Sequence, residues 1–179
     1  VMEKNRQGLL HIYCGDGKGK TSAAVGMAVR AAGCGMKVLV IRFLKTENSG
    51  EVEVLRSIPG ITVTPCDRTF GFVFRMTEEQ KQEAALYYQS RFEAAAKEAV
   101  QGQYDLLILD EILASCNYGM VRETSVVEFL KNRPEKLEVV LTGRNPSETF
   151  LELADYVSEI CMRRHPYEKG IPARRGIEF

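Results

Sequence analysis

Short apolar runs alternate with longer stretches of helical periodicity along the whole chain. An apolar run without strict alternation is typical of a strand buried on both faces, and a helical stretch between two such runs is typical of a crossover in a parallel sheet. The pattern therefore predicts an α/β fold with a mostly parallel central sheet flanked by helices. The expected strands are residues 9–14, 38–43, 61–64, 106–109, 139–142 and 156–161.

Two of the predicted helices have ends that single residues mark. The first runs over residues 19–32, and Gly33 suits a left-handed C-terminal cap. Another begins at Asn145, with Asn145 as the N-cap, Pro146 in the first turn and Glu148 near the positive end of the helix dipole. The first helix is expected to bury Ala24, Met27, Ala28 and Ala31.

Thr77 and Gln80, three residues later, make a capping box that predicts the start of a longer helix. This helix is expected to continue toward Gly102. Its apolar positions recur at ordinary helical spacing, so we expect them in the core rather than around a cofactor. They are Ala84, Tyr88, Phe92, Ala95, Ala96 and Ala99.

Length and composition narrow the class of protein. The 179 residues predict one domain over residues 8–179, after a flexible lead at residues 1–7. The 24 basic and 24 acidic residues cancel, which argues against nucleic acid as the main partner. Five scattered cysteines without a C-x-x-C pair fit a reducing compartment. No apolar run approaches the ~20 residues that span a bilayer, so we expect no membrane segment and a cytoplasmic location.

A glycine-rich segment follows the first predicted strand and opens the first predicted helix. Backbone N–H groups surround phosphate oxygens where side chains leave room, and in the usual Walker A chemistry Lys20 reaches the phosphates and the Thr21 hydroxyl ligates Mg²⁺. Counting back from Gly19, the position of the usual first glycine is Cys14, so the loop is one residue short. A glycine-rich turn without a ligand is the alternative. The segment is Gly15, Asp16, Gly17, Lys18, Gly19, Lys20, Thr21 and Ser22.

Two carboxylates, Asp110 and Glu111, follow the buried strand predicted at residues 106–109. Because ligands of parallel sheets sit at the carboxyl ends of strands, we expect both near Lys20 and Thr21, as in the Walker B motif. Carboxylate oxygens suit a hard divalent ion on a polyphosphate. The two motifs together predict the RecA-like fold of P-loop NTPases, the alternative being that these acids merely start a solvated loop.

Arginines offer further phosphate ligands. Arg144 follows a predicted strand, so its planar fork would enter the same crevice, whereas Arg30 on the first helix and Lys18 in the loop are weaker candidates. The run from Arg163 to His165 is expected to be a solvated basic segment.

Three aromatic residues, Phe70, Phe72 and Phe74, share one predicted loop. Aromatic side chains in a loop suggest a flat apolar ligand or a lid. Packing beneath their own loop is an equally good interpretation.

The combined motifs resemble the P-loop class of ATP:corrinoid adenosyltransferases of cobalamin biosynthesis and salvage. The likeness covers nearly the whole chain and rests on residues 15–21, 109–111, 142–144, 151–155 and 165–179. It implies that the Co(I) of a reduced corrinoid attacks the ribose 5′ carbon of ATP and releases triphosphate. Family members are described as binding the triphosphate in the reverse direction, which fits a shortened loop.

The resemblance also implies roles for single residues. Residues 15–22 would cradle the triphosphate, with Arg144 and Arg30 supporting its oxygens. The implied Mg²⁺ ligands are Thr21, Asp110 and Glu111, and the residues implied in catalysis are Lys20, Thr21 and Glu111.

Phe72 and Phe74 match a pair of aromatics that, in the family, press on the lower face of the corrinoid and free the cobalt of its lower ligand. The second of them is tryptophan in relatives, and this chain has no tryptophan. The likeness further implies a homodimer and an electron donor of flavodoxin type or another reductase.

Two other classes of function are compatible with the motifs. A phosphotransferase or ATPase would attack the terminal phosphate, with Glu111 activating water or an acceptor hydroxyl, and would release orthophosphate or a phosphorylated acceptor. A nucleotide-dependent switch is the other alternative, although residues 131–134 do not make a guanine-reading motif.

Overall fold

A parallel sheet forms the centre of the molecule in a computed structural model that describes residues 7–71 and 73–178. Its strand order is β3-β2-β4-β5-β1-β6, and every pairing is parallel. The predicted fold class is therefore confirmed. The strands are β1 (Leu10–Cys14), β2 (Val38–Arg42), β3 (Ile61–Val63), β4 (Leu106–Asp110), β5 (Glu138–Thr142) and β6 (Tyr156–Glu159).

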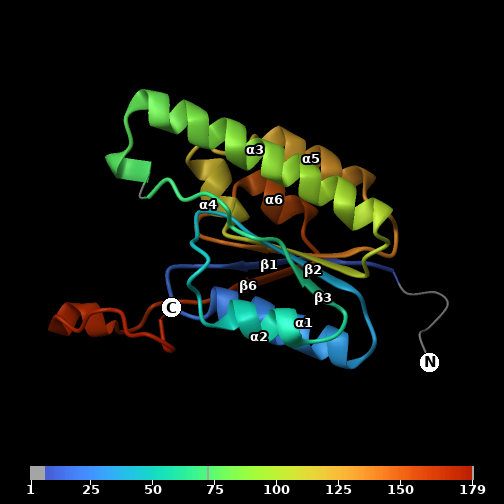
Figure 1. The fold of residues 1–179 in the computed structure, drawn as a ribbon, viewed down its shortest axis with the longest axis horizontal. Coiled ribbons are helices and arrows are strands. Elements are labelled where there is room, and N and C mark those ends of the chain that lie inside the picture. The colour runs from blue at the N-terminus through green and yellow to red at the C-terminus, as the bar shows by residue number, and fades with distance from the viewer. Residues whose placement is uncertain (1–6, 72, 179) are drawn as a thin grey trace.

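Helices cover both faces of this sheet (Figure 1). On one face lie α1 (Lys20–Gly33) and α2 (Glu51–Ser57); on the other lie α3 (Glu78–Gln101), α4 (Ile112–Asn117), α5 (Glu123–Asn132) and α6 (Glu148–Leu153). Two short 3₁₀ helices, Val73–Arg75 and Pro166–Lys169, complete the described elements. Within the described ranges no helix is long and apolar enough to cross a membrane.

The longest helix, α3, forms as its sequence predicts. The Thr77 hydroxyl accepts a hydrogen bond from Gln80 N at 3.3 Å, and Gln80 Oε1 accepts one from Thr77 N at 2.9 Å. Five of the six expected core positions are buried, and Ala96 is partly buried. The capping box therefore fixes where the helix begins, and its apolar stripe packs on the sheet.

Two predicted helix ends are wrong. Helix α1 includes Gly33, and the left-handed residue is Gly35 (φ 80°), whose N–H caps Ala32 O at 2.9 Å. Helix α6 is capped by Ser147, whose hydroxyl accepts from Phe150 N at 3.4 Å, while Asn145 is left-handed (φ 49°). In both places a residue of suitable type two positions further on, Gly35 or Ser147, makes the capping hydrogen bond instead. Met27 of α1 is also only partly buried.

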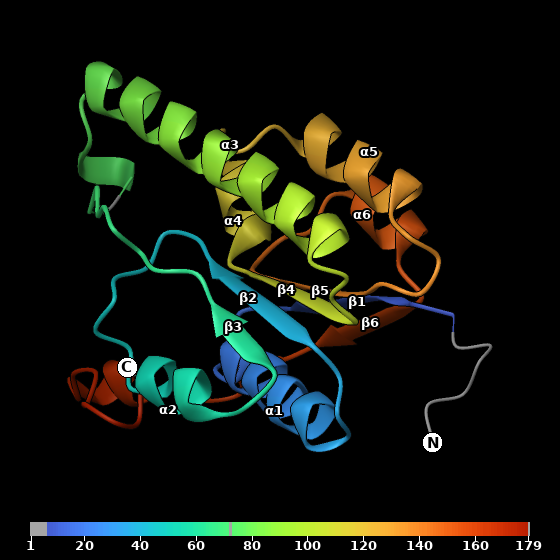
Figure 2. The same ribbon diagram turned by 45° about the vertical axis from the view of Figure 1, so that its right-hand side comes forward.

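The carboxyl ends of the strands form the edge that positions the site. Beyond this edge, the first turns of α3 and the short helix Val73–Arg75 extend on one face of the sheet (Figure 2). The segment that follows β6 extends beyond the same edge on the side of the sheet that carries α1 and α2 (Figure 2). Residues 1–6 of the predicted lead, Phe72 and Phe179 lie outside the described residues.

Candidate active site

The glycine-rich loop connects β1 to α1, as predicted, and it packs tightly on the chain that follows β6. Gly17 N donates to Ile160 O at 2.7 Å, and Met162 N donates to Asp16 Oδ1 at 2.8 Å. A Cβ on Gly17 would lie 2.7 Å from Ile160 O, so this glycine is required by a neighbouring backbone. Sequence reasoning missed this contact because nothing local shows that β6 lies beside β1.

Lys20 begins α1 and is nearly buried, with 8 % of its surface exposed. Its Nζ donates to Gly17 O at 2.8 Å, so the side chain folds back over the loop. Burial lowers the pKa of this amine, and the nearby Glu111 carboxylate opposes that shift. The position fits a lysine that can turn toward a phosphate at the loop.

Asp110 lies at the end of β4 beside the start of α1, which confirms the predicted meeting of the two motifs in space. Its Oδ1 accepts hydrogen bonds from Thr142 Oγ1 at 2.6 Å and Thr21 Oγ1 at 3.0 Å. Only 2 % of Asp110 is exposed. Thr142 also accepts from Glu111 N at 2.9 Å, so one hydroxyl orients both acidic residues.

Glu111 adopts a left-handed conformation with φ 62°. Burial, and then the charge of Asp110, raise the pKa of its carboxyl, while Lys45, Lys20 and Arg144 lower it. Its electrostatic neighbours are thus the same groups that surround the loop. Two adjacent carboxylates and a hydroxyl give this place a set of hard oxygen donors.

Lys45 was not predicted in the site. Its Nζ donates to Asp110 Oδ2 at 2.6 Å and to Thr21 Oγ1 at 2.8 Å. The signal was available, because Lys45 follows the apolar run at residues 38–43, and β2 pairs with β4 so that Arg42 lies opposite Asp110. A polar residue just after a strand next to the acidic strand belongs to the same crevice.

The outer side of the loop is more exposed. Arg144 Nη2 donates to Asp16 O at 3.4 Å, which places this arginine at the loop as predicted. Lys18 Nζ donates to Glu178 Oε1 at 3.3 Å, so the C-terminal segment reaches the loop as well. Ser22 is exposed in the first turn of α1.

Arg30 lies apart from this group. It belongs to the last turn of α1, ten residues after Lys20, which corresponds to about 15 Å along the helix axis. Its charge acts instead on Tyr13, where it lowers the pKa against the larger raising effect of burial. Within one chain Arg30 therefore lies away from the loop, and its assignment as a phosphate ligand stays a prediction.

The two described aromatic residues of the predicted loop lie in different environments. Phe70 packs on Tyr87 and Tyr88, with ring centroids 5.4 and 5.8 Å away, so its ring lies against α3. Phe74 is 78 % exposed beside the Arg75 guanidinium. Phe72 lies outside the described residues. The basic run holds exposed Arg163 and Arg164, as expected of a solvated segment.

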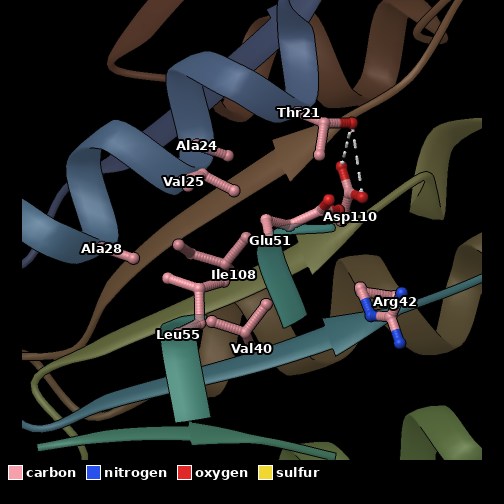
Figure 3. A pocket seen from close by; sticks show the side chains of 10 residues that line it. All are labelled: Thr21, Ala24, Val25, Ala28, Val40, Arg42, Glu51, Leu55, Ile108 and Asp110. Carbon is pink, nitrogen blue, oxygen red and sulfur yellow. Dashed lines mark hydrogen bonds between the residues drawn. The ribbon is translucent and has the colours of Figure 1, made fainter. Parts of the chain in front are cut away.

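A small pocket adjoins the Thr21–Asp110 pair between α1, α2, β2 and β4 (Figure 3). The two polar residues are joined at one end of it, and the side chains of α1 face those of the sheet across it (Figure 3). Apolar side chains therefore adjoin the polar network on this side. They are Ala24, Val25, Ala28, Val40, Leu55 and Ile108.

Two solved structures with a similar fold are distant from this chain in sequence. The KaiC-like protein of Pyrococcus horikoshii has a TM-score of 0.50 and 14% identity, over 89% of this chain and 75% of that one. The cytoplasmic domain of EssC has a TM-score of 0.53 and 15% identity, over 96% of this chain and 37% of that one. At this identity the likeness concerns the fold alone, and it confirms the predicted P-loop NTPase fold.

Sequence relatives identify the family. A protein 32% identical over 98% of this chain and 86% of its own length is the corrinoid adenosyltransferase of Pseudomonas aeruginosa. That of Escherichia coli K12 is also 32% identical, over 98% of this chain and 88% of its own length. The family model described as ATP:corrinoid adenosyltransferase BtuR/CobO/CobP matches residues 6–179. The chain therefore belongs to the ATP:corrinoid adenosyltransferase family.

Proposed function

We propose that this protein transfers the 5′-deoxyadenosyl group of ATP to the Co(I) of a reduced corrinoid, forming an adenosylcobalamin-type product in cobalamin biosynthesis or salvage. The observation that carries the proposal is the family match over residues 6–179. It is supported by the meeting of the glycine-rich loop with Asp110 at the carboxyl edge of the sheet, where Thr21 and Asp110 are hydrogen-bonded.

The loop residues 15–22 bind the triphosphate in this proposal. Lys20, whose Nζ donates to Gly17 O, turns to a phosphate oxygen. Arg144 and Lys18 add positive charge from the exposed side, where their present contacts, at 3.4 and 3.3 Å, are long enough to give way. Ser22 contributes from the first turn of α1.

Thr21, Asp110 and Glu111 hold Mg²⁺ in the same proposal. The residues fit a hard divalent ion, because a hydroxyl and two carboxylates lie together and a cationic group, the Lys45 ammonium, already binds two of their oxygens. When bound, Mg²⁺ supplies positive charge to the triphosphate. Thr142 orients Asp110 and the Glu111 backbone.

In the reaction, the Co(I) electron pair forms a bond to the ribose 5′ carbon while the bond from that carbon to oxygen breaks. The leaving triphosphate keeps the electron pair of the broken bond, so negative charge grows on the oxygen nearest the sugar. Lys20 and the loop N–H groups stabilise that charge, and the cobalt makes the new bond itself. The catalytic roles fall to Lys20, Thr21 and Glu111.

Phe74 and Phe72 contact the corrinoid in this proposal. The exposed ring of Phe74, beyond the carboxyl edge, suits a large flat ligand. We extend the proposal to a homodimer that takes electrons from a flavodoxin-type or other reductase in the cytoplasm. The five unpaired cysteines support that location.

An anaerobic assay with Mg-ATP and chemically reduced cob(I)alamin tests the reaction. The proposal expects a light-sensitive alkylcorrinoid that forms only with the protein, together with triphosphate. Lys20→Met should abolish product, and Lys81→Met, which removes an exposed lysine paired with Glu78 on α3, should leave it unchanged. Unchanged corrinoid with released orthophosphate would move the protein to the ATPase or kinase class.

A further inference from the structure

The ammonium of Lys45 lies between two oxygens that the proposed function assigns to the metal. It is 2.6 Å from Asp110 Oδ2 and 2.8 Å from Thr21 Oγ1. Asp110 is buried, and its other oxygen is occupied by the hydroxyls of Thr142 and Thr21. Lys45 therefore supplies the positive charge in direct contact with a carboxylate that water hardly reaches.

The main chain on both sides of Lys45 is fixed. Before it, Phe43 N donates to Asp110 O at 2.9 Å, and Leu44 is held at φ 53°. After it, the buried Arg42 guanidinium donates to Thr46 O at 2.9 Å and pairs with Glu47. Only the flexible four-carbon side chain of Lys45 can move far, so its ammonium can leave Asp110 and still remain in the site.

We propose that Lys45 holds the metal position in the nucleotide-free protein and yields it when Mg²⁺ arrives with the triphosphate. The inference rests on the proposed function in taking Thr21 and Asp110 as metal ligands. An ammonium and a divalent cation cannot share two oxygens without strong repulsion. Entry of the metal therefore displaces the Lys45 side chain, and the triphosphate is the nearby anion that receives it.

This exchange makes metal binding depend on the triphosphate. Without a phosphate to accept Lys45, a divalent ion must compete with an ammonium that is already hydrogen-bonded in a buried setting. With the triphosphate present, both cations have anionic partners. Metal and triphosphate consequently bind with positive cooperativity, and the coupling is reciprocal.

Binding of Mn²⁺ to the nucleotide-free protein, followed by electron paramagnetic resonance of the free ion, tests the exchange without turnover. Lys45→Met keeps the length of the side chain and removes its charge, so Mn²⁺ alone should bind about tenfold or more tightly than to the unchanged protein. Lys45→Gln retains a hydrogen-bond donor for Asp110 and should show the same gain if the methionine variant folds poorly. Circular dichroism establishes that each variant is folded.

Two further lysine variants are the matched controls. Lys18→Met removes a positive charge from the outer side of the loop, and Lys81→Met removes one from α3. Both should bind Mn²⁺ within about threefold of the unchanged protein, because neither ammonium contacts Asp110. Equal or weaker Mn²⁺ binding by both folded Lys45 variants would overturn the inference, as would an equal gain in Lys18→Met.

A second titration with Mn²⁺ and inorganic tripolyphosphate measures the coupling. The factor by which tripolyphosphate strengthens Mn²⁺ binding should fall about tenfold in Lys45→Met, and an unchanged factor would overturn the exchange. These readouts involve no corrinoid. Failure of the proposed function would appear separately, as absent adenosyl transfer by the unchanged protein.

Discussion

The inner and outer sides of the glycine-rich loop hold their charges in different surroundings. On the inner side, Lys45 meets an Asp110 side chain that is 2 % exposed, and two threonine hydroxyls complete the contact. On the outer side, Lys18 meets Glu178 at 3.3 Å with its own side chain half exposed. A buried pair is strongly coupled and costly to break, whereas solvent and salt screen an exposed pair.

This difference suggests how the site divides its work. The inner groups are positioned before any ligand arrives, because hydrogen bonds from fixed elements hold each of them. The outer groups, Lys18 and Arg144, lie on exposed segments and can rearrange around a triphosphate at little cost. Substitutions on the two sides should therefore differ in size and in salt dependence.

The largest effect is expected from Asp110→Ala. It removes the partner of Lys45 and the acceptor of two threonines, so the free energy of unfolding should fall by about 3 kcal/mol and adenosyl transfer should be lost. Urea unfolding and the corrinoid assay measure the two effects. Glu178→Ala is the matched change on the outer side. If it lowers the free energy of unfolding as much as Asp110→Ala does, the distinction between the inner and outer sides is contradicted.

The second largest effect is expected from Gly17→Ala. Its Cβ would lie 2.7 Å from Ile160 O and force the loop away from the chain after β6, at a cost of about 2 kcal/mol and with weaker ATP binding. Gly26→Ala is the control, since a Cβ there meets nothing within 4 Å and α1 should gain up to about 1 kcal/mol. Thermal unfolding that ranks the two variants in the opposite order would refute the packing argument.

The next effect concerns the corrinoid, which the proposal places against Phe72 and Phe74. Replacing Phe72 and Phe74 together by alanine should slow turnover about tenfold when Co(II) must be reduced on the protein, and much less when Co(I) is supplied chemically. Phe70→Ala serves as a control for packing, because that ring packs at a tilt against Tyr87 and Tyr88. Equal losses in both assays would remove the lower-face role.

The smallest effect is expected from the pair of Lys18 and Glu178. Glu178→Gln should leave the unfolding midpoint unchanged and alter ATP affinity less than threefold, an effect that about 0.5 M salt removes. Hydrogen bonding with Arg174 lowers the pKa of Glu178 to about 2. The carboxylate thus stays charged as the pH falls to about 4, and its contacts are lost only near its own pKa. A contact that breaks in mild acid would contradict this assignment.

The fold was largely predictable because buried parallel strands are apolar in their own local sequence. Each of the six expected runs matches a strand to within two residues at either end, and the Thr77 box starts α3. The strand order was not predictable, since the pairing of β6 with β1 joins distant segments. Caps were uncertain where two suitable residues lay close together, as with Asn145 and Ser147.

The site was predictable where one topological rule applies. Strand ends meet at one edge, which placed Thr21 and Asp110 together across the chain. The same rule also places Lys45 at this edge. It was not predicted because a single lysine after a strand does not form a recognisable sequence motif. Arg30 is the opposite case, because its type suits phosphate but the last turn of α1 holds it away from the loop, so its role stays a prediction.

The bond that breaks in ATP is the most direct test of the proposed reaction. The protein would be incubated anaerobically with reduced corrinoid and with ATP that carries oxygen-18 between the ribose 5′ carbon and the first phosphorus. Mass spectrometry would then locate the label in the products. The account predicts labelled triphosphate in the same amount as adenosylcorrinoid, because the bond from carbon to oxygen is cleaved. Labelled ADP with orthophosphate, and no adenosylcorrinoid, would contradict it.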